Sequence, residues 1–211
     1  GELIRITGEG SSLVVVSGLS NPEGIAPDED GGVYLTEDIA GGRLLHISAD
    51  GIATRMTDGL AYSEGVAHLD KGRVLVTMAK AESGSLPLFS TAVLMVDGDA
   101  INEVFSTVYL WSFSDLVVDD AGIAYVCNEL SGYAFITESL IRVNTITGDW
   151  SVFATGMHSC EGVCSTPGSF FPLYVAEEDI GDGTGRISSV DSTGRVNTIA
   201  EGFLNIEDVA V

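Results

Sequence analysis

One segment recurs along the chain, and its period decides what the chain can fold into. Residues 18–37, GLSNPEGIAPDEDGGVYLTE, return in four later copies that begin at Gly59, Tyr109, Gly156 and Gly202. The alignment gives each copy one acidic residue at the same point, namely Glu23, Glu64, Asp115, Glu161 and Glu207. Their spacings of 41, 51, 46 and 46 residues are typical of a propeller blade made of four antiparallel strands.

Four short apolar runs can be followed within a unit. The first begins just after the acid, and the second ends in a polar group, as in VYLTED, AYVCNE and LYVAEED. The third recurs as RLLHISADG and RISSVDSTG, and the fourth as ATRMTDG and VNTIAEG. Turn residues rich in Gly and Asp separate the runs, which indicates antiparallel strands. The sequence therefore predicts an all-β propeller of four-stranded blades.

The two ends of the chain complement each other in this scheme. ELIRITGEGSSLVVVSG matches strands three and four of a unit, and GFLNIEDVAV matches strand one. Pairing strands from both ends closes a propeller without an open edge. We therefore expect one domain over residues 1–211 with five blades, over residues of about 18–58, 59–107, 108–155, 156–201, and 202–211 together with 1–17. One strand of the shared blade is absent, so a longer parent chain with six blades stays an alternative.

The charge balance excludes some partners. The chain has 31 Asp and Glu against 9 Lys and Arg, a formal net charge of −22, which repels nucleic acid and anionic membrane surfaces. No apolar run approaches the 18 or so residues that span a bilayer. An acidic surface favours an extracytoplasmic or secreted setting, although the compartment stays open. Three cysteines leave at least one unpaired, so no disulfide framework is implied.

Radial symmetry predicts an acidic end of the central channel. The five repeated acids should lie around one mouth, and strand two should return to the same face. This adds substrate-binding candidates at Glu37, Asn128, Glu129 and Glu177. Because like charges raise one another's pKa, a hard cation would relieve the ring. Ca²⁺ accepts six to eight oxygens, with Mg²⁺ or another divalent cation as the alternative.

A structural interpretation of the same acids stays open beside the metal site. Each acid can accept hydrogen bonds from backbone N–H groups of the neighbouring blade, and the repetition then reflects duplication of a stable unit with no bound ion. The sequence does not decide between the two interpretations.

Other side chains near the acids are candidates for chemistry. His158 lies three residues before Glu161 and is a candidate general base or ligand, although a lone loop histidine is more often solvated. Tyr62, Tyr109 and Trp111 precede the acids of their units. Such aromatic rings stack on sugars at a channel mouth, yet pack between blades equally often.

The repeat resembles a known group of propellers. The segments NPEGIAPDEDGGVYLTE and YSEGVAHLDKGRVLVT, joined to RLLHISADG, resemble the group that holds the gluconolactonase and senescence-marker-protein family, strictosidine-synthase-like proteins and NHL repeats. In the lactonase family a Glu that opens an inner strand binds a channel cation together with an Asn and an Asp. The resemblance implies this role for Glu23 and Glu64, with Asp115 in place of the family's Asp. The family's Asn-Gly motif is absent.

Two functions of different classes follow. The first is a metal-dependent hydrolase of lactones or esters, in which Glu23, Glu64, Asp115, Glu161 and Glu207 hold the cation and Asp115 or His158 serves as base. Asp115 is thus a candidate for both roles. The second is a non-catalytic module that binds a protein or glycan partner, which the missing Asn-Gly motif favours.

Overall fold

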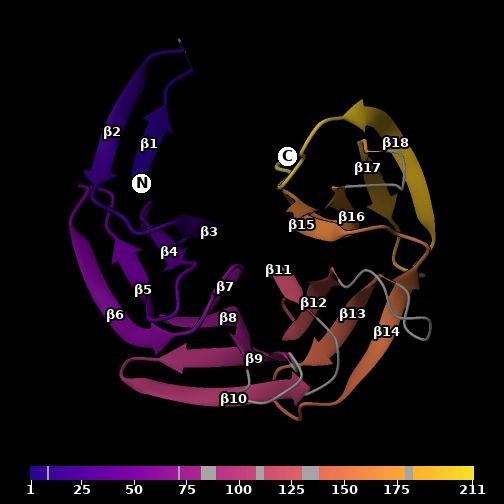
Figure 1. Cartoon of the computed structure of the whole chain (residues 1–211), viewed down its shortest axis with the longest axis horizontal. Coiled ribbons are helices and arrows are strands. Elements are labelled where there is room, and N and C mark those ends of the chain that lie inside the picture. Colours follow the sequence, from indigo (N-terminus) through magenta and orange to yellow (C-terminus); the bar gives the residue numbers. More distant parts are fainter. Residues whose placement is uncertain (9, 71, 82–88, 108–111, 130–137, 179–182) are drawn as a thin grey trace.

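The chain folds as a β-propeller. The computed structural model describes residues 1–8, 10–70, 72–81, 89–107, 112–129, 138–178 and 183–211. These residues form antiparallel sheets that follow one another around a central axis (Figure 1). The described part of the chain contains no helix that could cross a membrane.

Each blade has four strands in sequence order from the axis outward. Blade 1 contains β3 (Pro22–Pro27), β4 (Val33–Glu37), β5 (Gly42–Ile47) and β6 (Ala53–Leu60). Blade 2 contains β7 (Val66–Asp70), β8 (Arg73–Ala81), β9 (Phe89–Asp97) and β10 (Ala100–Thr107). Blade 3 contains β11 (Phe113–Val118), β12 (Ile123–Asn128), β13 (Ser139–Asn144) and β14 (Trp150–Thr155). Blade 4 contains β15 (Cys160–Thr166), β16 (Ser169–Glu177), β17 (Gly185–Val190) and β18 (Val196–Phe203).

The described residues form four complete blades where the sequence predicted five. The described residues form four four-stranded sheets, and β1 (Glu2–Ile6) pairs only with β2 (Ser12–Ser17). Residues 204–211 form no strand, so the two chain ends do not share a sheet. The physical reason lies in the strand order: strands one and three of a blade are both hydrogen-bonded to strand two and not to each other.

The core lies between the blades. Strand β8 shows this most clearly, because Val74, Leu75 and Val76 are each 0% exposed although neighbouring side chains point to opposite faces. Val74 and Val76 pack against blade 1, and Leu75 packs against blade 3. A strand buried on both faces needs a continuous apolar run, which explains why the second strand of each unit does not alternate. Each blade is thus held by its neighbours.

Glycine follows the acid where the inner strands approach closely. The inner strands β3, β7, β11 and β15 contact one another in this order. A Cβ atom added at Gly65 would lie 2.6 Å from the backbone oxygen of Ser114 in blade 3. At Gly24 it would clash with the backbone oxygen of Glu64. The glycine after the acid is therefore required by packing at the axis, whatever the role of the acid.

Candidate functional site

The loops that lead into the inner strands share one backbone shape. A glycine five residues before the acid has positive φ in four copies: Gly18 (77°), Gly59 (77°), Gly156 (84°) and Gly202 (89°). The residue two before the acid also has positive φ: Asn21 (47°), Tyr62 (51°), Ser159 (43°) and Asn205 (50°). L-residues rarely adopt this conformation, so the fold imposes it. We call each segment from this glycine to the acid a lead-in loop.

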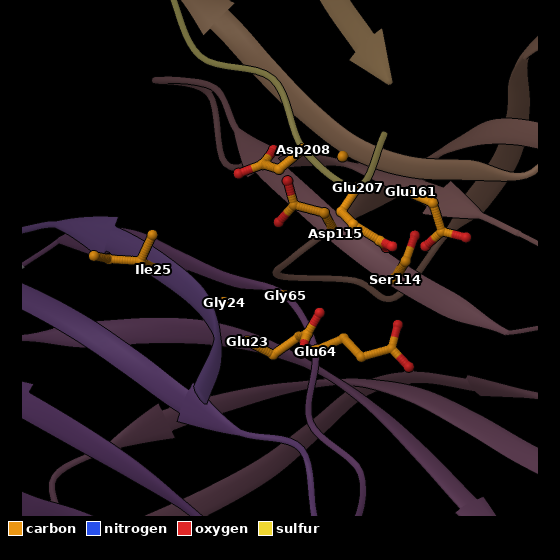
Figure 2. A pocket seen from close by; sticks show the side chains of 11 residues that line it. Glu23, Gly24, Ile25, Glu64, Gly65, Ser114, Asp115, Glu161, Glu207 and Asp208 are labelled. Atoms are coloured by element: carbon orange, nitrogen blue, oxygen red, sulfur yellow. The ribbon is translucent and has the colours of Figure 1, made fainter. Parts of the chain in front are cut away.

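The structure brings the five repeated acids to one cavity. Its volume is about 150 Å³, and its lining includes all five together with Ser114 and Asp208. Figure 2 shows Glu23 and Glu64 on one side of the site and Asp115, Glu161 and Glu207 on the other. Although residues 204–211 form no strand, the lead-in loop before Glu207 has the same shape as the others. The fifth acid therefore still faces the channel.

Asp115 does not occupy the position that the sequence alignment gave it. The N–H groups of Asp38, Glu129 and Glu178 donate at 2.9 Å to the carbonyl oxygens of Asn21, Ser112 and Ser159. In blades 1 and 4 the acceptor lies two residues before the acid, which makes Ser114 the blade 3 equivalent of Glu23 and Glu161. Asp115 occupies the position of the following glycine. A shift of one residue turns a strand side chain to the other face.

The shifted position gives Asp115 a backbone partner in the next blade. Its Oδ2 accepts the N–H of Val163 in blade 4 at 2.9 Å. Burial raises the pKa of Asp115 to about 7, while hydrogen bonds from the N–H groups of Val163 and Leu116 oppose the shift. The interpretation of a repeated acid as a backbone acceptor therefore describes Asp115.

Three glutamates form the tightest group at the mouth. Ligand oxygens of Glu64, Glu129 and Glu161 all lie within 4.8 Å of one another, and the three side chains are half-buried. They come from blade 2, the end of strand two in blade 3, and blade 4. We call them the three-Glu cluster. The sequence predicted Glu129 as a substrate-binding residue, because it does not reveal that the end of strand two in blade 3 lies between Glu64 and Glu161.

Burial and the charges of neighbouring acids raise the pKa values of Glu64 and Glu161 in the three-Glu cluster. Burial raises the pKa of Glu64 to about 8, and the charge of Glu129 adds to the shift. Burial likewise raises the pKa of Glu161 to about 9, aided by the charge of Glu129 and a hydrogen bond with it. The cavity lining contains no Lys or Arg among the described residues. Carboxylate oxygens without a counter-charge fit a hard divalent cation such as Ca²⁺ or Mg²⁺.

Glu23 and Glu207 line the cavity outside this cluster. Burial raises the pKa of Glu23, and the charges of Asp38 and Glu207 raise it further by smaller amounts. The structure therefore divides the predicted five-residue metal set: Glu64 and Glu161 gather with Glu129, whereas Glu23 and Glu207 line the cavity without belonging to that cluster. Asp208, which also lines the cavity, was missed. Its signal was present, because the fifth copy has Asp where three others have Gly after the acid.

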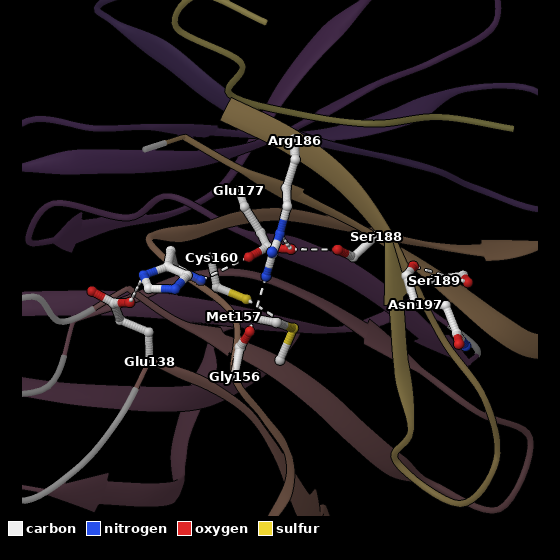
Figure 3. A network of polar contacts seen from close by, with 10 residues as sticks. Glu138, Gly156, Met157, Cys160, Glu177, Arg186, Ser188, Ser189 and Asn197 are labelled. Carbon is white, nitrogen blue, oxygen red and sulfur yellow. Dashed lines mark hydrogen bonds and ion pairs between the residues drawn. The ribbon is translucent and has the colours of Figure 1, made fainter. Parts of the chain in front are cut away.

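Glu37 and Glu177 are held away from the mouth. Both side chains are 0% exposed. Arg43 donates through Nε and Nη2 to both oxygens of Glu37 at 2.5 Å, and Arg186 Nε donates to Glu177 at 2.8 Å (Figure 3). Side chains alternate along a strand, so the next residues, Asp38 and Glu178, turn to the channel. Both carboxylates are buried and paired with an arginine, so they are not placed to contact a substrate at the mouth.

Asn128 takes the corresponding position in blade 3. It is 0% exposed and lies directly opposite Ser139 on the neighbouring strand. Its side-chain N and O atoms have no hydrogen-bond partner within the described ranges. The structure therefore buries Asn128 inside the blade and does not bring it to the mouth.

The remaining candidates lie apart from the cavity or outside the described residues. His158 is exposed, with Nδ1 3.4 Å from Oε2 of Glu138, and neither His158 nor Tyr62 is among the residues that line the cavity. Tyr62 is 43% exposed on its lead-in loop. Tyr109 and Trp111 fall outside the described residues, so their stacking role stays a prediction.

Solved structures share this fold. The PQQ-bound aldose sugar dehydrogenase of Streptomyces coelicolor has a TM-score of 0.73 at 14% identity, covering 100% of this chain and 76% of that chain. A gluconolactonase of Xanthomonas campestris has 0.66 at 18% identity, with coverages of 92% and 68%. This chain has the gluconolactonase-like propeller fold. No protein-family model matches its sequence, and no curated protein does either.

Another similar structure is that of a protein named as a binding protein and not as an enzyme. An auxiliary nutrient binding protein of Bacteroides thetaiotaomicron has a TM-score of 0.69 at 15% identity, with coverages of 94% of this chain and 52% of that chain. This chain therefore spans about half the length of that protein. The resemblance predicted from the repeat is confirmed for the fold, and identities this low show the fold alone.

Proposed function

We propose that this protein hydrolyses small lactones or esters with the aid of a divalent cation held by the three-Glu cluster. The observation that carries the proposal is the meeting of Glu64, Glu129 and Glu161, whose ligand oxygens lie within 4.8 Å of one another in the channel-mouth region. The fold shared with a gluconolactonase supports the reaction class. When bound, a cation supplies Lewis acidity toward the substrate carbonyl and water.

Asp115 is the residue of this chain best suited to move the proton. It lines the same cavity, and its pKa of about 7 lies near neutral pH, where a general base works best. As the C–O bond to the attacking water forms, Asp115 accepts the water's proton. As the acyl C–O bond of the lactone breaks, Asp115 returns the proton to the alcohol oxygen.

The cavity also suggests what the substrate is like. A volume of about 150 Å³ holds a single small ring, well below the several hundred Å³ of drug-sized sites. Glu23 and Glu207 can accept hydrogen bonds from substrate hydroxyl groups. An acidic lining attracts a neutral lactone more than an anionic compound and favours departure of the carboxylate product.

The test combines turnover with ion binding. Purified protein freed of metal is given a panel of five- and six-membered sugar lactones and simple aryl esters with Ca²⁺, Mg²⁺ or Mn²⁺. We expect hydrolysis only with an added ion, and loss of ion binding and turnover in Glu161→Gln. Glu29→Gln, an exposed glutamate outside the cavity, is the matched control and should behave like the wild type. Turnover in EDTA equal to that with ions would overturn the proposal.

A non-catalytic binding module is the second candidate. The missing Asn-Gly motif and the fold shared with a nutrient-binding protein favour it. It predicts ion binding at the same cluster without turnover of any lactone or ester. Calorimetry with neutral mono- and disaccharides in the presence of Ca²⁺ would then give heats of binding.

A further inference from the structure

Blades 1 and 4 each contain an ion pair between a buried glutamate and an arginine behind their lead-in loops. In blade 4 the pair is Glu177 and Arg186, and in blade 1 it is Glu37 and Arg43. Each glutamate ends strand two, and each arginine is the second residue of strand three. Glu177 lies directly opposite Arg186 in the strand register. We call each pair a buried clasp.

The blade 4 clasp binds its lead-in loop at two points. The backbone N–H of His158 donates to Glu177 Oε2 at 2.7 Å, and Arg186 Nη2 donates to the carbonyl oxygen of Gly156 at 2.9 Å (Figure 3). Ser188 Oγ and Arg186 Nε donate to Glu177 Oε1 at 2.5 and 2.8 Å, which fixes the carboxylate. The loop is thereby held three residues before Glu161.

The blade 1 clasp makes the equivalent contact. The backbone N–H of Ser20 donates to Glu37 Oε1 at 2.8 Å. Ser20 lies three residues before Glu23, as His158 lies three residues before Glu161. The recurrence in two blades shows that the carboxylate accepts the same loop N–H each time.

The clasp is not required to build a blade. Thr77 in blade 2 and Thr36 in blade 1 each accept the N–H of the glycine after the acid, so the two threonines are equivalent. The residue that follows is Met78 in blade 2 and Glu37 in blade 1. Blade 3 has Asn128 there, opposite Ser139. Both blades form four-stranded sheets without a glutamate and an arginine at these positions. A buried ion pair is also a weak source of stability, because desolvation offsets its attraction.

We propose that the buried clasps are positioning devices, and that Glu177 and Arg186 fix Glu161 within the three-Glu cluster. The inference rests on the proposed function. Its physical basis is that neighbours which hold a ligand residue in place raise ion affinity by sparing the cost of ordering that residue on binding. Glu23, held by the other clasp, lies outside the three-Glu cluster.

This difference supplies a control inside the same molecule. Glu177→Gln and Glu37→Gln remove the same buried charge from equivalent clasps, but only the first lies behind a cluster residue. Isothermal titration with Ca²⁺ at pH 8 should give an affinity roughly 10- to 100-fold weaker than wild type for Glu177→Gln, and within about twofold of wild type for Glu37→Gln. Arg186→Lys, which removes the Nε contact with Glu177, repeats the test if Glu177→Gln does not fold.

Hydrogen exchange measures the clasp independently of the ion. We expect faster amide exchange over residues 156–161 in Glu177→Gln and over residues 18–23 in Glu37→Gln, each at temperatures where the variant stays folded. Equal affinity losses in the two variants, or unchanged affinity in Glu177→Gln, would overturn the positioning role while leaving the metal site intact. If the wild type binds none of the ions, the proposed function is refuted. If amide exchange over the lead-in loops is also unchanged in the two variants, the positioning role of the clasps is refuted as well.

Discussion

Binding of Ca²⁺ to the three-Glu cluster should release about two protons at pH 7. The pKa values of about 8 for Glu64 and about 9 for Glu161 leave these groups roughly one-tenth and one-hundredth ionised at that pH. A cation requires them as carboxylates, so binding displaces both protons. The apparent affinity should therefore rise on the order of 100-fold from pH 6 to pH 7, and level off above about pH 9.

Calorimetry can count these protons. Titrations at pH 7 in two buffers with different ionisation enthalpies give the number released, and a series from pH 6 to 9 gives the affinity slope. Glu29→Gln, which lies outside the cavity, should leave the count unchanged. Release of less than half a proton, or equal affinity at pH 6 and pH 8, would refute the reasoning.

The same pKa values set how the ion-free protein responds to pH. Both carboxyls have a higher pKa folded than unfolded, so the folded state holds protons that the unfolded state has lost. Stability is therefore fully present below about pH 4.5 and falls as pH rises toward 8 for Glu64 and 9 for Glu161, by up to about 1.4 kcal/mol per pH unit for each group. Urea unfolding in EDTA should show this decline between pH 5 and pH 8, and saturating Ca²⁺ should reverse it.

Two further substitutions test the packing at the axis and the proposed base. Gly65→Ala places a Cβ 2.6 Å from the Ser114 backbone oxygen and should cost roughly 1–3 kcal/mol in urea unfolding; a variant as stable as wild type contradicts the close approach. Asp115→Asn keeps an oxygen for the Val163 N–H but cannot take a proton, so hydrolysis should fall roughly 10²- to 10⁴-fold with Ca²⁺ affinity unchanged. Equal losses of both would assign Asp115 to ion binding instead.

The repeat alone determined the blade architecture and the convergence of acids. A period of 41 to 51 residues with glycine five positions before the acid predicts four-stranded propeller blades. The positive φ values of Gly18, Gly59 and Gly156 explain why glycine recurs there. The second strand, such as Val74 to Val76, could be predicted from its continuous apolar run, which it needs because both its faces are buried. Local pattern suffices where each repeat meets the same environment.

Tertiary structure alone decided which acids lie close together. One step along a strand turns the side chain to the opposite face. The register therefore decides that Asp38 and Glu37 point to different faces, and likewise Ser114 and Asp115. Sequence spacing does not reveal that Glu129 returns between Glu64 and Glu161, since their distance depends on how three blades pack. Whether the two chain ends share a blade likewise depends on the second strand of that blade, because strands one and three both pair with it. Contacts between units far apart in the chain carry no local signal, and the candidate site is built from such contacts.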